Sequence, residues 1–203
     1  MQWSVRAGRP EDARVLARLS LMAGHGYFEV LYRDLFPDRP LEDVIVERRS
    51  LNPASFGYYA NWRAAVTDAG DVAGGINDFL PGEVAHFEYD PIVPGDTKAI
   101  FAPFDALDAH IENTLHIAML AVFPEYRHYG IARGLIRAAI DRSRHAGVSA
   151  VSLLSFEQDE RLVRYYESLG FQIVGRCPMI PHPLFQCDGN LVAMVMPVAL
   201  GER

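Results

Sequence analysis

Hydrophobic and polar positions along the chain follow two different periods, which predicts a mixed α/β fold. Short apolar runs with strand character occupy residues 3–7, 61–67, 72–79, 114–122, 148–156, 171–177 and 190–198. Apolar residues three and four positions apart predict helices from residue 10 onward and over 27–49, 104–113, 130–146 and 160–169. Glycines lie at the ends of three of these helices, where they stop the helical pattern: Gly24, Gly147 and Gly170.

Segment 80–113 is the least regular part of this pattern. Four prolines interrupt any continuous helix or strand there: Pro81, Pro91, Pro94 and Pro103. The segment carries seven acidic residues against Lys98 alone. Two interpretations stay open, a solvated surface insertion or an acidic rim that attracts a cationic molecule. A helix over 104–113 would place three of the acids on one face: Asp105, Asp108 and Glu112.

Composition narrows the class of protein. With 203 residues, 50% of them hydrophobic, the chain can bury one sizeable core, and we expect a single domain over residues 1–203. No apolar run approaches the ~20 residues that span a bilayer, and the N-terminus lacks the apolar stretch of a signal peptide. Two cysteines are too few for a disulfide scaffold, so we expect a cytoplasmic protein. The net charge of −7 argues against nucleic-acid binding.

The most informative segment is 115–146, where a buried strand, a tight basic turn and an amphipathic helix follow one another. The turn would aim backbone N–H groups and the positive end of a helix dipole at one point, which is how proteins bind a pyrophosphate. Two other phosphate loops are excluded. A Walker loop needs Gly-Lys-Ser/Thr, and the only lysine is Lys98. A dinucleotide fingerprint needs three glycines after the first strand of a βαβ unit.

The remaining pattern, Arg-x-x-Gly-x-Ala after a strand ending Leu-Ala-Val-Phe-Pro-Glu-Tyr, resembles the acyl-CoA pyrophosphate loop of the GCN5-related N-acetyltransferase (GNAT) family. The predicted element order also matches that family over nearly the whole chain. The resemblance implies a GNAT acyl-CoA N-acyltransferase fold, with a central mixed, mostly antiparallel sheet flanked by helices. Segment 80–113 would be an acidic insertion before the central strand. Acetyl-CoA would be the acyl donor.

The same resemblance implies which residues hold the donor. Six would bind its pyrophosphate, mainly through main-chain N–H groups: Arg127, His128, Tyr129, Gly130, Ile131 and Ala132. In the family, a bulge in the preceding strand leaves backbone groups available to the pantetheine arm, here those of Leu120, Ala121 and Val122. The Val122 N–H would face the thioester oxygen and polarise it.

A second segment, Arg164-Tyr165-Tyr166-Glu167-Ser168-Leu169-Gly170-Phe171, resembles the family's Leu-Tyr-Glu-Lys-Leu-Gly-Phe run. By that match Tyr166 would protonate the departing CoA thiolate, and the alternative is a tyrosine packed on the sheet. Seven residues earlier the family usually has Asn, whereas this chain has Asp159. Asp159 is therefore a candidate cofactor contact without the amide donor, and it can instead cap the following helix.

The general base is predicted on the central strand. An alkylammonium has a pKa of about 10 and must lose a proton before it attacks. His116 lies six residues before Val122; arylalkylamine acetyltransferases carry a His at this strand position and GCN5-type enzymes a Glu. Strand alternation would place His116, Ala118 and Leu120 on one face, and an imidazole that titrates near neutrality suits the task. A half-buried structural histidine is the alternative.

These patterns predict an N-acetyltransferase that moves the acetyl group of acetyl-CoA directly to the primary amine of a small, cationic acceptor. A protein N-terminus or lysine is the alternative acceptor, and a non-catalytic acyl-CoA-binding module is the alternative function. The seven histidines show no paired ligand spacing, so we expect no metal site. We expect neither a nucleic-acid nor a membrane partner, while exposed sheet edges would permit a homodimer.

Overall fold

A computed structural model of the chain describes residues 1–80, 82–83 and 90–200. Each predicted strand is present, within two residues of its expected bounds. The strands are β1 (Trp3–Ala7), β2 (Trp62–Thr67), β3 (Val72–Phe79), β4 (Leu115–Val122), β5 (Ala150–Phe156), β6 (Gln172–Pro178) and β7 (Asn190–Pro197). They form one seven-stranded sheet in the order β1-β2-β3-β4-β5-β7-β6. Neighbours are antiparallel except β4 and β5, which are parallel.

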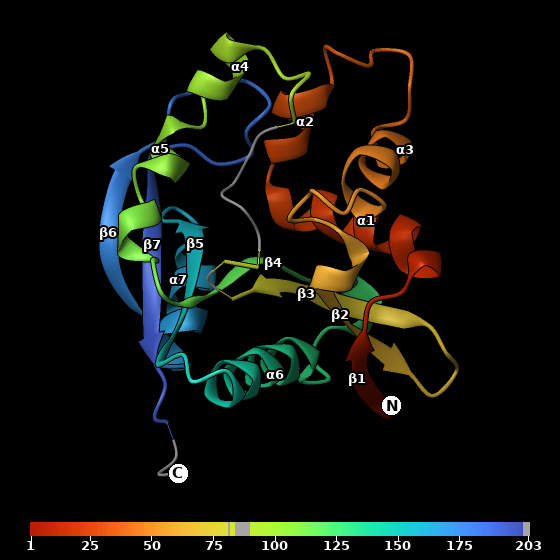
Figure 1. Cartoon of the computed structure of the whole chain (residues 1–203), viewed down its shortest axis with the longest axis vertical. Coiled ribbons are helices and arrows are strands. Elements are labelled where there is room, and N and C mark those ends of the chain that lie inside the picture. Colours follow the sequence, from red (N-terminus) through yellow and green to blue (C-terminus); the bar gives the residue numbers. More distant parts are fainter. Residues whose placement is uncertain (81, 84–89, 201–203) are drawn as a thin grey trace.

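Helices cover both faces of this sheet. They are α1 (Ala13–Gly24), α2 (Tyr27–Tyr32), α3 (Leu41–Ile45), α4 (Gly95–Ala99), α5 (Ala102–Asp105), α6 (Ile131–His145) and α7 (Glu160–Ser168). Figure 1 shows α6 on one side of β1–β4 and α1–α3 on the opposite side. One hydrophobic cluster packs against α6 and α7, and a second packs against α1 and α2. The expected mixed, mostly antiparallel sheet flanked by helices is confirmed.

The predicted helix over 104–113 is wrong in its extent. Helix α5 ends at Asp105, and a separate 3₁₀ turn covers Asp108–His110. A segment this short has little helical stability of its own, so the burial of Leu107 and Ile111 in a third hydrophobic cluster decides its backbone path. The three acids of this segment therefore do not share one helix face.

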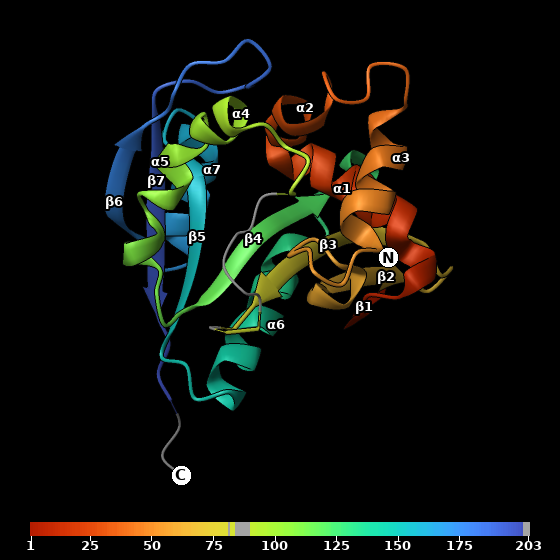
Figure 2. The same cartoon turned by 45° about the horizontal axis from the view of Figure 1, so that its top comes forward.

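Strand β4 changes its relation to both neighbours at Ala118. Its pairing with β3 passes from Met119 to Ile117 and leaves out Ala118, which is therefore the extra residue of a β-bulge. Its parallel pairing with β5 ends at the pair Ile117–Leu153. Figure 2 shows the two strands diverging beyond this point. The bulge that the family resemblance implies is confirmed.

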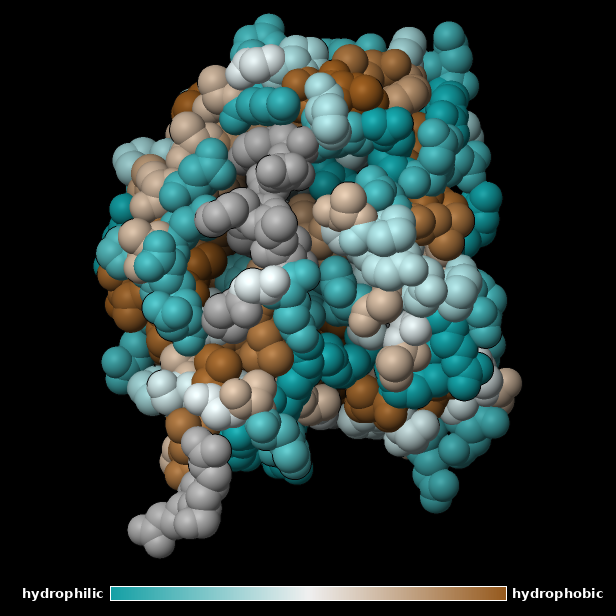
Figure 3. Space-filling model, viewed as in Figure 1, coloured by the Kyte–Doolittle hydropathy of each residue, from teal (hydrophilic) through white to brown (hydrophobic). Residues whose placement is uncertain are grey.

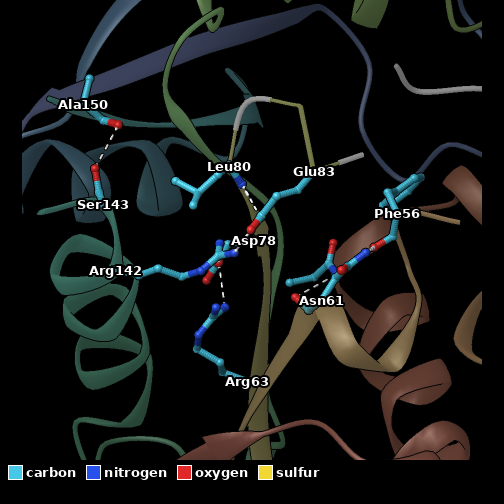
Figure 4. A network of polar contacts seen from close by, with 10 residues as sticks. Phe56, Asn61, Arg63, Asp78, Leu80, Glu83, Arg142, Ser143 and Ala150 are labelled. Atoms are coloured by element: carbon cyan, nitrogen blue, oxygen red, sulfur yellow. Dashed lines mark hydrogen bonds and ion pairs between the residues drawn. The ribbon is translucent and has the colours of Figure 1, made fainter. Parts of the chain in front are cut away.

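The end of β3 beside the bulge is fixed by the ion-pair network in Figure 4. Asp78 Oδ1 accepts hydrogen bonds from Arg63 at 2.6 Å and from Arg142 of α6 at 2.7 Å. Arg142 also pairs with Glu83, whose carboxylate accepts the Leu80 N–H at 2.7 Å. Burial raises the pKa of Asp78, and the two guanidinium groups oppose that rise. The network thus ties the start of the insertion to β2 and α6.

The surface in Figure 3 shows hydrophobic residues as separate patches among hydrophilic ones. The large hydrophobic side chains that are exposed come from many parts of the chain: Met1, Leu51, Ile92, Tyr129, Val174, Ile180 and Leu200. Among the described residues, every helix falls short of the length and apolar character that crossing a membrane requires.

Candidate active site

A cavity, termed the donor cavity, lies between the end of β4, the start of α6 and helix α7. It contains nine of the ten predicted cofactor contacts: Leu120, Ala121, Val122, Arg127, His128, Gly130, Ile131, Ala132 and Asp159. Tyr166, the predicted acid, lines it as well. The fold therefore brings together the two sequence segments that were singled out separately, residues 120–132 and 159–166.

The turn before α6 has the form of an anion site. His128 and Gly130 adopt left-handed backbone conformations, with φ of 69° and 76°, and Gly130 is the N-cap of α6. Left-handed residues at a helix start turn successive N–H groups toward one side, which makes a concave donor surface for an anion. Three guanidinium groups line the same cavity: Arg127, Arg133 and Arg161. Backbone donors and cations together suit the phosphates of acetyl-CoA.

The Val122 backbone points toward the side where β4 and β5 diverge. The N–H of Phe123 donates to the Ala73 carbonyl of β3 at 3.0 Å. Backbone groups alternate in direction along a strand, so the Val122 N–H points away from β3. Its carbonyl points the same way and accepts a hydrogen bond from Arg127 Nε at 3.4 Å. Val122 thus presents a donor on the donor-cavity side of the strand.

Tyr166 is held on α7 by core packing. It is 6% exposed, and its ring lies edge-on to Phe171 with 5.7 Å between centroids. Burial raises the pKa of the Tyr166 phenol, and the neighbouring Tyr165 and Asp159 add to the rise. The hydroxyl therefore keeps its proton at neutral pH and is available as a donor. Tyr165 also lines the cavity, and burial raises its pKa too.

Two predicted contacts differ from the rest. Asp159 is the N-cap of α7, and its Oδ1 accepts the Leu162 N–H at 3.0 Å, so its capping role is confirmed. Tyr129 lies outside the residues that line the cavity. It is 51% exposed, and its carbonyl accepts a hydrogen bond from Trp3 Nε1 at 3.2 Å. The left-handed residues on either side of Tyr129 account for this outward position, because they turn the chain sharply there.

A second pocket, termed the acceptor pocket, lies between α1, the insertion and strands β4 and β5. Most of its wall is apolar, with four aromatic rings: Tyr27, Phe56, Phe104 and Phe156. Asp105 and Asp108 line it and reach solvent, whereas Glu112 lies outside its wall and is exposed. Two of the three acids predicted to attract a cation therefore do border a pocket.

His116 forms part of this pocket and is 5% exposed. Its Nδ1 lies 3.0 Å from Ser152 Oγ of β5. Burial lowers the pKa of His116 to about 4. The expectation that this ring titrates near neutrality is therefore wrong, because desolvation disfavours the imidazolium. The ring is neutral at pH 7, and one of its nitrogens can accept a proton.

The bulge changes which residues share a face of β4. His116 and Ala118 line the acceptor pocket as expected, but Met119 joins them and Leu120 faces the donor cavity. Simple alternation places Leu120 with His116, and the extra residue Ala118 reverses that alternation. One strand therefore contributes to both pockets.

The β6–β7 loop packs against the α1–α2 turn, and the neighbours of this turn, Gly24 and Tyr27, line the acceptor pocket. The Gln186 N–H donates to the His25 carbonyl at 2.9 Å. Gly26 has φ of 96°, and a Cβ there would come 2.0 Å from the Leu184 carbonyl oxygen. The turn between α1 and α2 thus lies directly against this loop. Gly24, in the preceding helix, is part of the pocket wall.

Sequence reasoning missed the contribution of α1 and most of the acceptor pocket. Met22 and His25 line the donor cavity although nothing in their sequence context marks them. Arg133 and Arg161 had a usable signal, since each lies within one helical turn of a recognised segment. The aromatic walls had none, because such residues cannot be told from ordinary core residues without the fold.

Comparisons with known proteins agree with this architecture. A family model described as acetyltransferase (GNAT) family matches residues 27–171. N-alpha-acetyltransferase 30 of Schizosaccharomyces pombe is 39% identical over 66 residues, which cover 32% of this chain and 44% of that protein. The chain thus spans less than half the length of this curated relative.

Solved structures share the fold. An N-acetyltransferase from Staphylococcus aureus Mu50 superposes with a TM-score of 0.65 at 18% identity, over 95% of this chain and 100% of that one. A chain of the NatC complex bound to Gag peptide and CoA gives a TM-score of 0.54 at 17% identity, over 98% and 100%. Because the family model matches most of the sequence, the predicted family is confirmed: the chain belongs to the acetyltransferase (GNAT) family.

Proposed function

We propose that this chain acetylates the primary amine of a small, cationic acceptor by direct attack, with acetyl-CoA and the acceptor bound together. The observation that carries the proposal is the division of β4 at its bulge. His116, Ala118 and Met119 line the acceptor pocket, and residues 120–122 line the donor cavity. An amine in one pocket and a thioester in the other would meet where β4 and β5 diverge, and such positioning of two reactants supplies much of an enzyme's rate.

The residues around this meeting point support three steps. His116, or a water that it holds, would accept the ammonium proton. The Val122 N–H would stabilise the negative charge that develops on the thioester oxygen. Tyr166 would give its phenolic proton to the departing thiolate and regain one from solvent.

The pKa of about 4 limits what His116 can do as a base. An alkylammonium has a pKa of about 10, so full transfer of its proton to this ring is strongly uphill. The environment of His116 therefore supports a hydrogen bond to the amine and the transfer of a proton through water while the C–N bond forms. Tyr166 acts under a similar limit, because its raised pKa favours a proton shared with the thiolate as the C–S bond breaks.

A small acceptor fits the bounded pocket better than a peptide does. The Gln186 N–H donates to the His25 carbonyl at the α1–α2 turn, beside the pocket residues Gly24 and Tyr27, and a peptide that extended over this turn would have to displace the β6–β7 loop. Apolar walls favour an acceptor with an apolar group next to its amine. Asp105 and Asp108, at the solvent end, would draw a cation toward the pocket.

Acetylation of a protein N-terminus is the second candidate. It is favoured by the 39% identity to N-alpha-acetyltransferase 30 of Schizosaccharomyces pombe over 66 residues. The contact between the α1–α2 turn and the β6–β7 loop weighs against it, since a chain that extended over this turn would have to displace the loop.

Thiol release from acetyl-CoA tests the proposal directly. The panel would contain small primary amines with alkyl or aromatic groups, matched tertiary amines as blanks, and short peptides with free N-termini. We expect turnover with the primary amines and little with the peptides. Preferred turnover of peptides would establish the second candidate. Tight acetyl-CoA binding by calorimetry, with no turnover of any amine or peptide, would identify a non-catalytic binding module.

A further inference from the structure

Three buried side chains form a continuous hydrogen-bonded chain behind His116. His116 Nδ1 lies 3.0 Å from Ser152 Oγ, and Ser152 Oγ lies 2.6 Å from Thr114 Oγ1. Thr114 Oγ1 in turn lies 2.6 Å from the Ile111 carbonyl oxygen. The strands supply this arrangement, because His116 of β4 is paired directly with Ser152 of β5 in the last stretch before the two strands diverge.

Counting hydrogens fixes the direction of every bond in the chain. The Ile111 carbonyl can only accept, so the single hydroxyl hydrogen of Thr114 is donated to it. Thr114 must then accept from Ser152, which uses the single hydroxyl hydrogen of Ser152. Ser152 has no further hydrogen to give and must accept from His116. Nδ1 of His116 therefore carries a proton.

Burial shields these hydrogen bonds from solvent. Ser152 is 0% exposed, His116 5% and Thr114 8%, so bulk water does not compete for the bonds. A ring kept neutral by desolvation carries only one proton. With that proton on Nδ1, Nε2 is the ring's hydrogen-bond acceptor.

We propose that Ser152 and Thr114 are positioning residues that hold His116 as its Nδ1–H tautomer and so make Nε2 the proton acceptor of the acceptor pocket. The consequence for catalysis rests on the proposed function, whereas the tautomer itself does not. Ile111 ends the insertion's 3₁₀ turn as its C-cap residue. The insertion therefore reaches the His116 ring through its backbone, in addition to the acids that it contributes to the pocket.

Nuclear magnetic resonance on the full chain measures the tautomer without any substrate. The protein would carry ¹⁵N-histidine, and two-bond ¹H–¹⁵N correlations distinguish a protonated from an unprotonated ring nitrogen. Signals of His116 are assigned by their loss in His116→Gln. We expect a protonated Nδ1 and an unprotonated Nε2 at neutral pH. A ring protonated on Nε2 would overturn the proposal without bearing on whether the chain is an acetyltransferase.

Ser152→Ala tests the positioning role, because it removes the acceptor for the Nδ1 proton while leaving the ring in place. We expect the His116 signals to move toward the Nε2–H form and kcat to fall about tenfold, the cost of one well-formed hydrogen bond. KM for acetyl-CoA should stay unchanged.

Ser155→Ala is the matched control, since Ser155 is a buried serine of the same strand whose Oγ has no hydrogen-bond partner within the described residues. This variant should leave the tautomer and kcat unchanged. Equal effects of the two substitutions would reduce Ser152 to a packing residue, and an unshifted tautomer in Ser152→Ala would reject its role. If the predicted tautomer and its shift appear but no amine is acetylated, the positioning stands and the proposed function fails.

Discussion

The donor cavity and the acceptor pocket share one strand but are built on opposite principles. The donor cavity combines backbone N–H groups at a helix start with three guanidinium groups and is contributed mainly by two continuous segments. The acceptor pocket is mostly apolar, draws on α1, α2, the insertion, β4, β5 and β7, and buries one neutral histidine. Charge and backbone geometry thus suit the phosphates of acetyl-CoA in the donor cavity. Shape and desolvation suit the amine proposed for the acceptor pocket.

Ala132→Glu, at the second position of α6, should produce the largest difference between the effects on the two sites, because it should weaken acetyl-CoA binding and leave amine binding intact. A carboxylate there would face the phosphates of acetyl-CoA, and two charges about 4 Å apart near a protein surface repel by roughly 4 kcal/mol. We expect KM for acetyl-CoA to rise about 10³-fold, with KM for the amine nearly unchanged. Steady-state kinetics with each substrate varied in turn measures both values.

The control for this prediction is Tyr129→Ala, three residues away in the same turn. Its side chain points to solvent and lies outside the donor cavity, so KM for acetyl-CoA should change little. An acid near a helix N-terminus does not destabilise the helix, so Ala132→Glu should keep the wild-type melting temperature. A similar rise in KM for the amine would show that the two sites are not separable in this way.

The burial of His116 in the acceptor pocket should lower the stability of the protein at acidic pH. The folded pKa of His116 is about 4 against an ordinary value of 6.5, so between these values the unfolded chain binds a proton that the folded chain resists. The free energy of unfolding should therefore fall as the pH drops from 6.5 to 4, by about 3 kcal/mol from this residue. Urea unfolding at a series of pH values measures the slope.

His116→Gln provides the comparison, because it removes the titrating ring and should flatten the dependence by that amount. Burial also lowers the pKa of His25, so part of the slope remains in the variant. His145→Gln, at an exposed position on α6, should behave like the wild type. Identical slopes for wild type and His116→Gln would mean that the ring is far less desolvated than its 5% exposure implies.

Tyr166→Phe should have the next largest effect. It removes the phenolic proton and keeps the ring that packs on Phe171. We expect kcat to fall about 100-fold, at the lower end of what a positioned acid contributes, with acetyl-CoA affinity by calorimetry unchanged. Tyr165→Phe is the matched control on the neighbouring residue and should retain most of kcat. If the two variants lost activity equally, the acid could not be assigned to Tyr166.

The donor cavity was easier to predict from the sequence than the acceptor pocket, because it is built mainly from two continuous segments. The pyrophosphate turn is a local motif whose backbone conformation depends on Gly130 and its sequence neighbours. Its residues could therefore be predicted from one continuous stretch of sequence. His116 was also singled out on its strand, but its lowered pKa was not predicted, because desolvation depends on side chains that only the fold brings near, such as Phe79, whose ring centroid lies 5.5 Å from that of His116. The family resemblance implied a bulge in this strand, but the residues themselves did not mark Ala118 as its position, since a bulge inserts one residue without changing the hydrophobic pattern around it.

The predicted helix over 104–113 failed for a related reason. Its apolar spacing was correct for a helix, but tertiary burial of Leu107 and Ile111 decided a tighter path. The acidic-rim interpretation therefore placed three acids on one helix face, whereas the pocket wall is mainly apolar and comes from segments far apart in the chain. Local motifs therefore predict the donor cavity, whereas long-range packing determines the wall of the acceptor pocket.

The smallest expected effect concerns the contact between the β6–β7 loop and the α1–α2 turn, which lies beside the acceptor pocket. Gly26→Ala would place a Cβ 2.0 Å from the Leu184 carbonyl at φ of 96°, so the β6–β7 loop has to move away from the α1–α2 turn. We expect KM for small amines to rise about tenfold, equivalent to roughly 1.4 kcal/mol, while KM for acetyl-CoA stays the same.

Gly70→Ala is the control. It carries the same conformational cost, at φ of 91° in the β2–β3 turn with nothing within 4 Å, and should alter only stability. A lower KM for peptides in Gly26→Ala would show that this contact is what excludes them, whereas matching kinetics in the two variants would mean that the loop contact has no part in acceptor selection.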